Sequence, residues 1–310
     1  MDKTLKRPFP RAELAQAVML IGLGVLLVSF VFARMNRDPF TTWFYSFAWW
    51  SYILIVDGWV YRHRGESLLL GYPRRFVFLS LWSVVFWCGF ELLNFRLQNW
   101  HYVGLPPGTG LRWTGYFLAF ATVVPGILET ADLLDTAGFL KSVSVTPLMR
   151  SARWISAAIG LALLALPLLW PTLFFPLVWG APIFLLEPVN ELVGAPSLLS
   201  DWRSGSLRRF ALLAMAGFLC GLLWEFWNHF AGAHWVYTVP GLDRWKIFEM
   251  PVIGYLGFLP FAVSVYTVSA TANILWERSN GAVRTLLVLA GLGFSLFVFA
   301  GLDRWTVLVG

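Results

Sequence analysis

The sequence predicts an all-α, polytopic integral membrane protein, a helical bundle of about nine transmembrane helices. Of its 310 residues, 58% are hydrophobic and only 13% are charged, about half the charge of a typical soluble domain. Nearly uncharged runs of about twenty residues recur, and this length crosses about 30 Å of hydrocarbon at 1.5 Å per residue. A motif that occurs twice predicts two tandem, parallel four-helix repeats followed by one C-terminal helix.

The predicted transmembrane helices follow one another closely along the chain. They cover residues 13–33, 43–60, 76–95, 114–131, 154–171, 173–189, 208–230, 247–272 and 283–301. Prolines 167, 171 and 176 crowd the joint between the fifth and sixth helices, so that boundary is the least defined. The first run is too long for a signal peptide and has no small-x-small cleavage site after it, so we expect a retained helix.

The distribution of positive charge predicts the orientation of the chain. With the N-terminus in the cytoplasm, sixteen of the 23 Lys and Arg residues fall in cytoplasmic segments and seven on the other face. The positive-inside rule then favours a multi-pass protein of the inner (plasma) membrane with a cytoplasmic N-terminus and an external C-terminus. Topology therefore explains the net charge of +6, and no basic stripe with interleaved aromatics indicates a nucleic-acid partner.

The repeated motif has four parts in the same order. The first copy is Cys88-Gly89, Glu91-x-x-Asn94, Trp100-x-Tyr102 and Gly110-Leu111-Arg112-Trp113. The second copy is Cys220-Gly221, Glu225-x-x-Asn228, Trp235-x-Tyr237 and Gly241-Leu242-Asp243-Arg244-Trp245. We expect a first repeat at 1–140, a second at 141–275 and a C-terminal transmembrane helix at 276–310. Two units of four helices enter the membrane in the same direction, and substrate sites of such proteins often lie at the repeat interface.

Glu91 and Glu225 are the leading candidates for a working site. A carboxylate inside a span costs roughly 2.5–3.5 kcal/mol on insertion scales, so it requires a partner, a water-filled cavity or a function. Both glutamates lie at nearly the same depth, and an asparagine follows each at i+3, on the same helix face. His229 follows Glu225 at i+4. The alternative is that each Glu and Asn satisfy each other and serve only the bundle.

The aromatic residues beyond each glutamate have two interpretations. Trp and Tyr commonly form belts at membrane interfaces. Their fixed spacing from each glutamate, together with a total of 18 Trp residues, favours aromatic faces that stabilise a cation. His101 and His234 leave a metal open, but four histidines and no His-Glu-x-x-His stretch indicate none, and we expect no cofactor.

A second layer of carboxyl groups lies near the cytoplasmic helix ends: Asp57, Glu129, Glu187 and Glu191. Glu129, Asp132 and Asp135 recur every third residue and share one helix face. Solvated helix ends would explain most of this layer. Glu187 is the exception, because it precedes Pro188 and recurs as Asp57 in the first repeat.

These residues resemble the repeated unit of the membrane carotenoid enzymes, namely the lycopene cyclase domain proteins and the related carotenoid hydratases. The similar stretches are Trp87 to Tyr102 with Pro125 and Glu129, and Leu223 to Tyr237 with Phe248-Glu249-Met250-Pro251. The Pro-x-Glu-Glu signature of the cyclase domains is missing, since Val252-Ile253-Gly254 follows Pro251. The resemblance implies protonation of a double bond in a long polyene, followed by ring closure or water addition.

The sequence thus predicts an enzyme that acts on a membrane lipid or isoprenoid by acid catalysis. Glu225 would be the acid and Glu91 its counterpart, with Asn94, Asn228 and His229 orienting them. We expect the substrate to contact Trp100, Tyr102, Trp224, Trp235, Tyr237 and Glu249. A small proton-coupled transporter or lipid carrier is the second hypothesis, and an accessory subunit of a membrane complex is the third. Homo-oligomerisation stays open.

Overall fold

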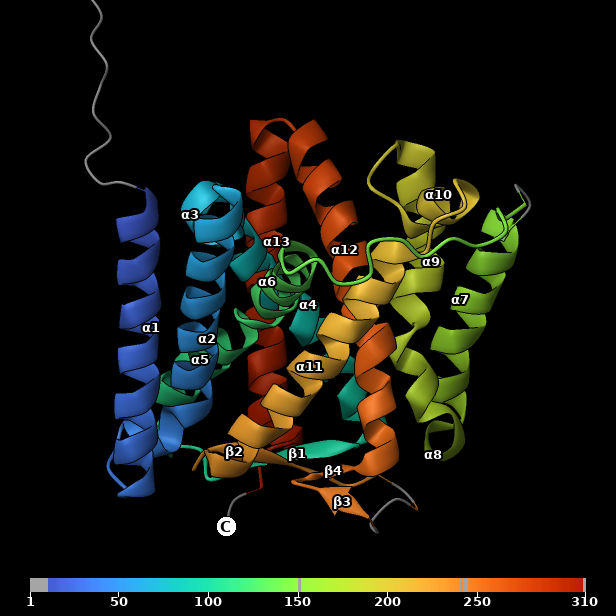
Figure 1. Ribbon diagram of the computed structural model, residues 1–310. Coiled ribbons are helices and arrows are strands. Elements are labelled where there is room, and N and C mark those ends of the chain that lie inside the picture. Colours follow the sequence, from blue (N-terminus) through green and yellow to red (C-terminus); the bar gives the residue numbers. More distant parts are fainter. Residues whose placement is uncertain (1–10, 150–151, 240, 242–244, 309–310) are drawn as a thin grey trace, which may run out of the picture.

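The computed structural model describes residues 11–149, 152–239, 241 and 245–308. It is an almost entirely helical bundle (Figure 1). Within the described residues, eight helical segments are long and apolar enough to cross a membrane. The chain is therefore a multi-pass membrane protein of the all-α class.

The first half of the chain contains six helices and one short strand. They are α1 Arg11–Arg34, α2 Phe40–Arg64, α3 Leu68–Gly71, α4 Pro73–Leu97, β1 Trp100–Val103, α5 Thr109–Phe120 and α6 Val123–Thr136. The helices α5 and α6 together form one apolar segment of 28 residues. The helix α2 has 25 residues but is not among the eight apolar segments, because its many Trp and Tyr residues and Asp57 lower its mean hydropathy.

The described residues of the second half form seven α-helices, two 3-10 helices and three short strands. Its first elements are α7 Ala152–Leu169, α8 Pro171–Phe174, η1 Phe175–Trp179, α9 Ala181–Val193 and α10 Leu198–Arg203. The rest are α11 Arg208–Phe230, β2 His234–Tyr237, β3 Lys246–Ile247, β4 Met250–Pro251, η2 Val252–Gly257, α12 Phe258–Arg278 and α13 Gly281–Trp305. The sixth predicted helix, 173–189, is divided into α8, η1 and α9, as the restricted backbone of the prolines near residue 171 predicts.

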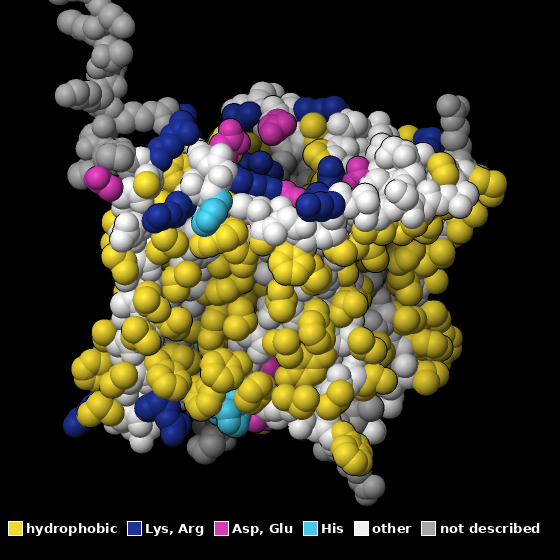
Figure 2. All heavy atoms as spheres, in the orientation of Figure 1, with side chains coloured by type: hydrophobic (Ala, Val, Ile, Leu, Met, Phe, Trp, Pro, Cys, Tyr) yellow, Lys and Arg dark blue, Asp and Glu magenta, His cyan; other side chains and the backbone are white. Residues whose placement is uncertain are grey.

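The two ends of the bundle differ in structure and charge. One end carries α3, α10 and the α12–α13 turn, and we call it the basic end; the other carries all four strands, and we call it the strand end (Figure 1). Hydrophobic side chains cover a continuous band between the ends, while Lys, Arg, Asp and Glu gather at the basic end (Figure 2). Such a band is the surface that a bilayer requires.

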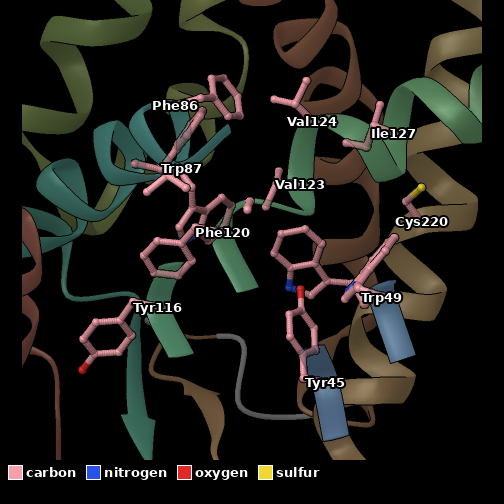
Figure 3. Packing of buried hydrophobic residues seen from close by; sticks show 14 of the residues in the cluster. Tyr45, Trp49, Phe86, Trp87, Tyr116, Phe120, Val123, Val124, Ile127 and Cys220 are labelled. Carbon is pink, nitrogen blue, oxygen red and sulfur yellow. The ribbon is translucent and has the colours of Figure 1, made fainter. Parts of the chain in front are cut away.

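The core is aromatic and lies between α2, α4, α6, α11 and α12. Figure 3 shows Tyr45 and Trp49 of α2 opposite Trp87 of α4 and Phe120 of α5. The least buried apolar segments are α1 and α7, followed by α13 and the α8–α9 segment, so these present most of the lipid-facing surface.

One helix was predicted to begin too early. The sequence pattern predicts a helix from residue 247, whereas Lys246–Ile247 and Met250–Pro251 form an antiparallel strand pair and the α-helix α12 begins at Phe258. Phe248 has a positive φ of 57°, and Pro251 lacks an N–H group for a helical hydrogen bond. Apolar composition alone therefore does not define this helix end.

Candidate active site

Glu91 lies on α4 and is completely buried. One of its oxygens accepts hydrogen bonds from Nε1 of Trp87 at 2.7 Å, from Nε1 of Trp100 at 3.1 Å and from the hydroxyl of Tyr102. The other oxygen lies 3.2 Å from Nε1 of Trp100. Both oxygens of Glu91 thus accept hydrogen bonds. The donors are two indole N–H groups, which can only donate, and one phenol.

Glu225 occupies the matching position on α11 and is also completely buried. Its Oε1 accepts a hydrogen bond of 2.7 Å from the hydroxyl of Tyr237. Within the described residues its Oε2 accepts no hydrogen bond of ordinary geometry; the nearby donor is Nε1 of Trp235, which makes no such bond either. One oxygen of Glu225 is therefore held only weakly, by the indole of Trp235, whereas both oxygens of Glu91 accept hydrogen bonds.

A glycine explains the difference between the two glutamates. The indole of Trp87 reaches Glu91 from one helical turn before it, whereas Gly221 stands one turn before Glu225. A Cβ atom at Gly221 would overlap the ring of Phe258 on α12. Because α12 packs against Gly221, no side chain at this position can donate to Glu225 as Trp87 donates to Glu91.

The side chains of Asn94 and Asn228 form hydrogen bonds with the backbone of the following strands and not with the glutamates. The side-chain amide of Asn94 donates to the carbonyl oxygen of Trp100 at 2.9 Å, and Asn228 donates to that of Trp235 at the same distance. Their amide oxygens accept from backbone N–H groups of the same segments, at 2.8 Å from Asn99 and 3.0 Å from Trp235. The asparagines fix the strands, and the strands carry the aromatic side chains to each glutamate.

The strands β1 and β2 pair with each other in antiparallel register. Trp100 lies opposite Tyr237, and Tyr102 lies opposite Trp235. Each cross-strand pair therefore combines the Trp of one motif with the Tyr of the other. Neighbouring cross-strand residues on one face lie close together, so the two motifs build a common site.

Each cross-strand pair lines one cavity. The Tyr102 cavity, of about 70 Å³, is lined by Tyr102 and Trp235 together with Tyr45, Tyr116 and Phe120. Figure 3 shows three of these side chains, Tyr45, Tyr116 and Phe120, in the aromatic core. The cavity is thus an aromatic chamber with little polar surface.

The Tyr237 cavity, of about 80 Å³, is its counterpart. It is lined by Trp100 and Tyr237 together with Trp179, Phe258 and Phe261. Trp87 and Trp224 border both cavities, and their ring centroids are 5.1 Å apart. These two indoles form the wall between the chambers.

Aromatic side chains separate Glu91 and Glu225 from the two cavities. Among the described residues, the lining of the two cavities includes the tyrosine and tryptophan partners of Glu91 and Glu225 but neither glutamate. Burial, and secondly the nearby Glu225, raises the pKa of the Tyr237 phenol well above its usual value. Tyr237 therefore stays protonated at physiological pH and places an O–H donor between Glu225 and its cavity.

Of the predicted site residues, His229 lies outside the site and Glu249 lies at its edge. His229 is exposed and packs against Phe230 and Phe248, with ring centroids 5.1 and 5.3 Å apart. It does not orient Glu225. Glu249 is half-buried and close enough to Glu225 for their charges to interact.

The sequence did not reveal several residues of the site. Trp87, at i−4 from Glu91, was the most accessible signal, because this spacing places both on one helix face. The role of Tyr116 could not be predicted from local sequence, because its hydroxyl donates at 3.0 Å to Asp303, 187 residues away. Asp303 also accepts both Nε and Nη2 of Arg112 at 2.9 Å. Asp303 belongs to Gly301-Leu302-Asp303-Arg304-Trp305, which repeats the last part of the second motif. This stretch thus supplies the Asp that is missing from the Gly-Leu-Arg-Trp of the first motif.

The chain matches no protein-family model, and neither the curated proteins nor the solved structures contain a significant match. In the described residues no group of three or more His, Cys, Asp or Glu side chains could hold a metal ion.

Proposed function

We propose that this chain is a membrane enzyme that protonates a terminal double bond of a long hydrophobic isoprenoid, such as a carotenoid. The observation that carries the proposal is buried Glu225, whose Oε2 accepts no hydrogen bond of ordinary geometry within the described residues and whose Oε1 bonds to Tyr237 in the wall of an aromatic cavity. A carboxyl group in apolar surroundings can act as a general acid. A small cavity suits one end of a chain whose remainder lies in lipid.

The proposed step uses Tyr237 and Glu225 together. For the reaction the protonated Glu225 carboxyl must donate to the phenol oxygen across the 2.7 Å contact, which turns the Tyr237 hydroxyl proton toward the cavity. In one concerted step the hydroxyl proton passes to the double bond, whose π electrons form the new C–H bond, and the Glu225 proton passes to the phenol oxygen, so no phenolate forms. The resulting carbocation closes a ring or is attacked by water. A proton released from the neighbouring carbon, or from that water, returns to Glu225, so the step consumes no oxidant or reductant. The faces of Trp87 and Trp224 stabilise the cation.

Pigment analysis tests this proposal. In a host that accumulates a linear carotenoid such as lycopene, the wild-type chain should convert the pigment into a cyclised or hydrated product. Glu225→Gln should lower conversion by about 10²-fold or more, the usual contribution of general acid catalysis. Glu277→Gln, an exposed change at the end of α12, is the matched control. An unchanged pigment profile with wild-type protein folded in the membrane would refute the proposal.

A proton-coupled carrier is the second candidate, favoured by carboxyl groups near both ends of the bundle. Glu91 and Glu225 lie toward the strand end, and Asp57, Glu129 and Glu187 lie buried toward the basic end. Such layers line proton and ion pathways in transporters. In a carrier, Glu225→Gln would change proton coupling of transport and leave the pigment composition as it was.

We infer that the chain crosses the membrane nine times, with the N-terminus in the cytoplasm. The helix α2 lies beside α1 over the same height, and α1 begins at the basic end whereas α13 ends at the strand end (Figure 1). This arrangement requires an odd number of crossings. The basic end then faces the cytoplasm, as the positive-inside rule favours.

Equivalent contacts in the two halves support a duplication. Asn94 and Asn228 bond to the backbone beside each Trp-x-Tyr. At the basic end, Asp57 accepts from Ser67 and Glu187 accepts from Ser197, both at 2.9 Å and both ten residues apart. We infer two repeats of four transmembrane helices, with α13 as the additional helix.

A further inference from the structure

Glu129 is a buried carboxyl group that the proposed reaction does not use. It lies on α6 and is completely buried. No hydrogen bond of ordinary geometry from the described residues reaches either of its oxygens. Its side chain faces the carboxyl group of Asp57 on α2, and the nearest backbone donor is the N–H of Leu69. Two acids therefore meet inside the bundle.

Both carboxyl oxygens of Asp57 accept hydrogen bonds. Its Oδ1 accepts from the backbone N–H of Leu69 at 2.6 Å, and its Oδ2 accepts from Ser67 at 2.9 Å and from the N–H of Leu70 at 3.1 Å. These donors stand at the start of the short helix α3. Since Asp57 accepts three hydrogen bonds, a proton on this pair belongs to Glu129.

The second half of the chain shows the same arrangement without the second acid. Glu187 accepts from Ser197 and from the N–H groups of Leu198 and Leu199. Its remaining oxygen accepts from the hydroxyl of Thr267 at 2.8 Å. A neutral hydroxyl thus donates to Glu187, and in the first half a carboxyl group takes the corresponding role beside Asp57.

We propose that Glu129 and Asp57 form a proton-binding site, in which Glu129 carries the proton and donates it in a hydrogen bond to Asp57. A protonated carboxyl supplies the O–H donor that Thr267 supplies to Glu187. It also avoids two adjacent carboxylates without a counter-ion in a buried place, which would be costly. The site is independent of the function proposed for Glu225.

The proton reaches this site from the basic end. Asp132 follows Glu129 by one turn of α6, has 46% of its side chain exposed and lies 3.6 Å from Arg64. Other charged or titratable groups near Glu129, Asp57 and Asp132 are Tyr52 of α2, Arg75 of α4, Asp135 of α6, and Arg208 and Cys220 of α11. Asp132 is therefore the carboxyl that connects Glu129 with solvent.

Infrared difference spectroscopy of the full-length protein in phosphatidylcholine vesicles tests this site. A protonated carboxyl and a carboxylate absorb in separate regions, so each variant reveals the state of the group it removes. Glu129→Gln should remove one protonated-carboxyl C=O band and leave the carboxylate bands in place. The matched control Glu187→Gln should remove carboxylate absorption and leave the protonated region unchanged. In D₂O, Asp132→Asn should slow the deuterium shift of the Glu129 band.

Three results would overturn the inference. The first is loss of carboxylate absorption in Glu129→Gln, which would make Glu129 ionised. The second is a Glu129→Gln protein that fails to fold, because Gln keeps the shape and the donor of a protonated Glu. The third is a Glu129 band whose deuterium shift is equally fast in Asp132→Asn. Pigment conversion by Glu129→Gln is a separate readout, so failure of this site and of the Glu225 proposal are distinguishable.

Discussion

Asp57 and Glu187 illustrate how two acids with similar partners differ in their tolerance of substitution. Asp57 receives a backbone N–H on each of its two oxygens. Glu187 receives both backbone N–H groups on Oε2, and its Oε1 contacts only the hydroxyl of Thr267. A hydroxyl can reverse its role and accept, whereas a backbone N–H cannot.

The amide variants should therefore differ in stability. In Asp57→Asn, one amide N–H₂ group must face a backbone N–H, and an unsatisfied buried donor costs about 1–3 kcal/mol. In Glu187→Gln, the amide oxygen can keep both backbone donors while its N–H₂ donates to Thr267, so we expect a smaller loss of about 0.5–1.5 kcal/mol. Thermal unfolding of both purified variants in one detergent measures the difference. Equal losses would contradict the assigned geometry.

At the residue scale, the sequence indicated the important acids but not their surroundings. The repeated Glu-x-x-Asn spacing predicted that Glu91 and Glu225 are special, and both are buried. The same spacing suggested that Asn94 orients Glu91, but Asn94 bonds to the backbone of the strand β1 instead. Helical periodicity does not reveal that the chain returns to the helix end as a strand, so this contact could not be predicted. His229 was predicted in the site for its i+4 spacing, and it faces outward instead.

At the element scale, contact between α11 and α12 depends on small residues. A Cβ atom at Gly217 would overlap the backbone carbonyl oxygen of Phe258 and come within 2.6 Å of Cβ of Ala262. Backbone cannot move aside as a flexible side chain does. Such close approach is how helices commonly associate in membranes.

Gly217→Ala should accordingly destabilise the protein by about 1–3 kcal/mol, the usual effect of overpacking. Gly24→Ala on α1 is the control, because a Cβ atom there meets nothing within 4 Å. We expect the control to be neutral or slightly stabilising. Thermal unfolding of the two variants side by side is the measurement, and a Gly217→Ala protein as stable as the control would refute the packing described for α11 and α12.

The sequence predicted helices better than strands. Each long apolar run predicts its own helix, because the signal is local. The pairing of β1 with β2 joins residues about 135 positions apart, such as Trp100 and Tyr237, and no local pattern contains that information. The cavities depend on this pairing, so their existence could not be predicted from sequence.

At the scale of the whole molecule, the proposed orientation places Lys141 and Thr109 on opposite sides of the membrane. Both are exposed. Lys141 lies in the loop that bonds to residues 205–208 after α10, at the basic end, and Thr109 begins α5 shortly after β1, at the strand end. The native cysteines, Cys88 and Cys220, are buried and should stay unreactive. In intact cells, a membrane-impermeant maleimide should label Thr109→Cys and label Lys141→Cys only after the membrane is opened. The reverse pattern would invert the topology.

The central claim is that Glu91 serves the structure whereas Glu225 is free to react. The most direct measurement compares thermal unfolding of purified Glu91→Gln and Glu225→Gln with the wild type. Glu91→Gln turns an amide N–H₂ toward the indole N–H of Trp100 and weakens the other hydrogen bonds to this group, so we expect a loss of about 1–3 kcal/mol. Glu225→Gln can keep the Tyr237 hydrogen bond on its amide oxygen, so we expect a smaller loss of about 0.5 kcal/mol, the lower end of a hydrogen bond's contribution. Equal losses, or a larger loss for Glu225→Gln, would contradict the claim.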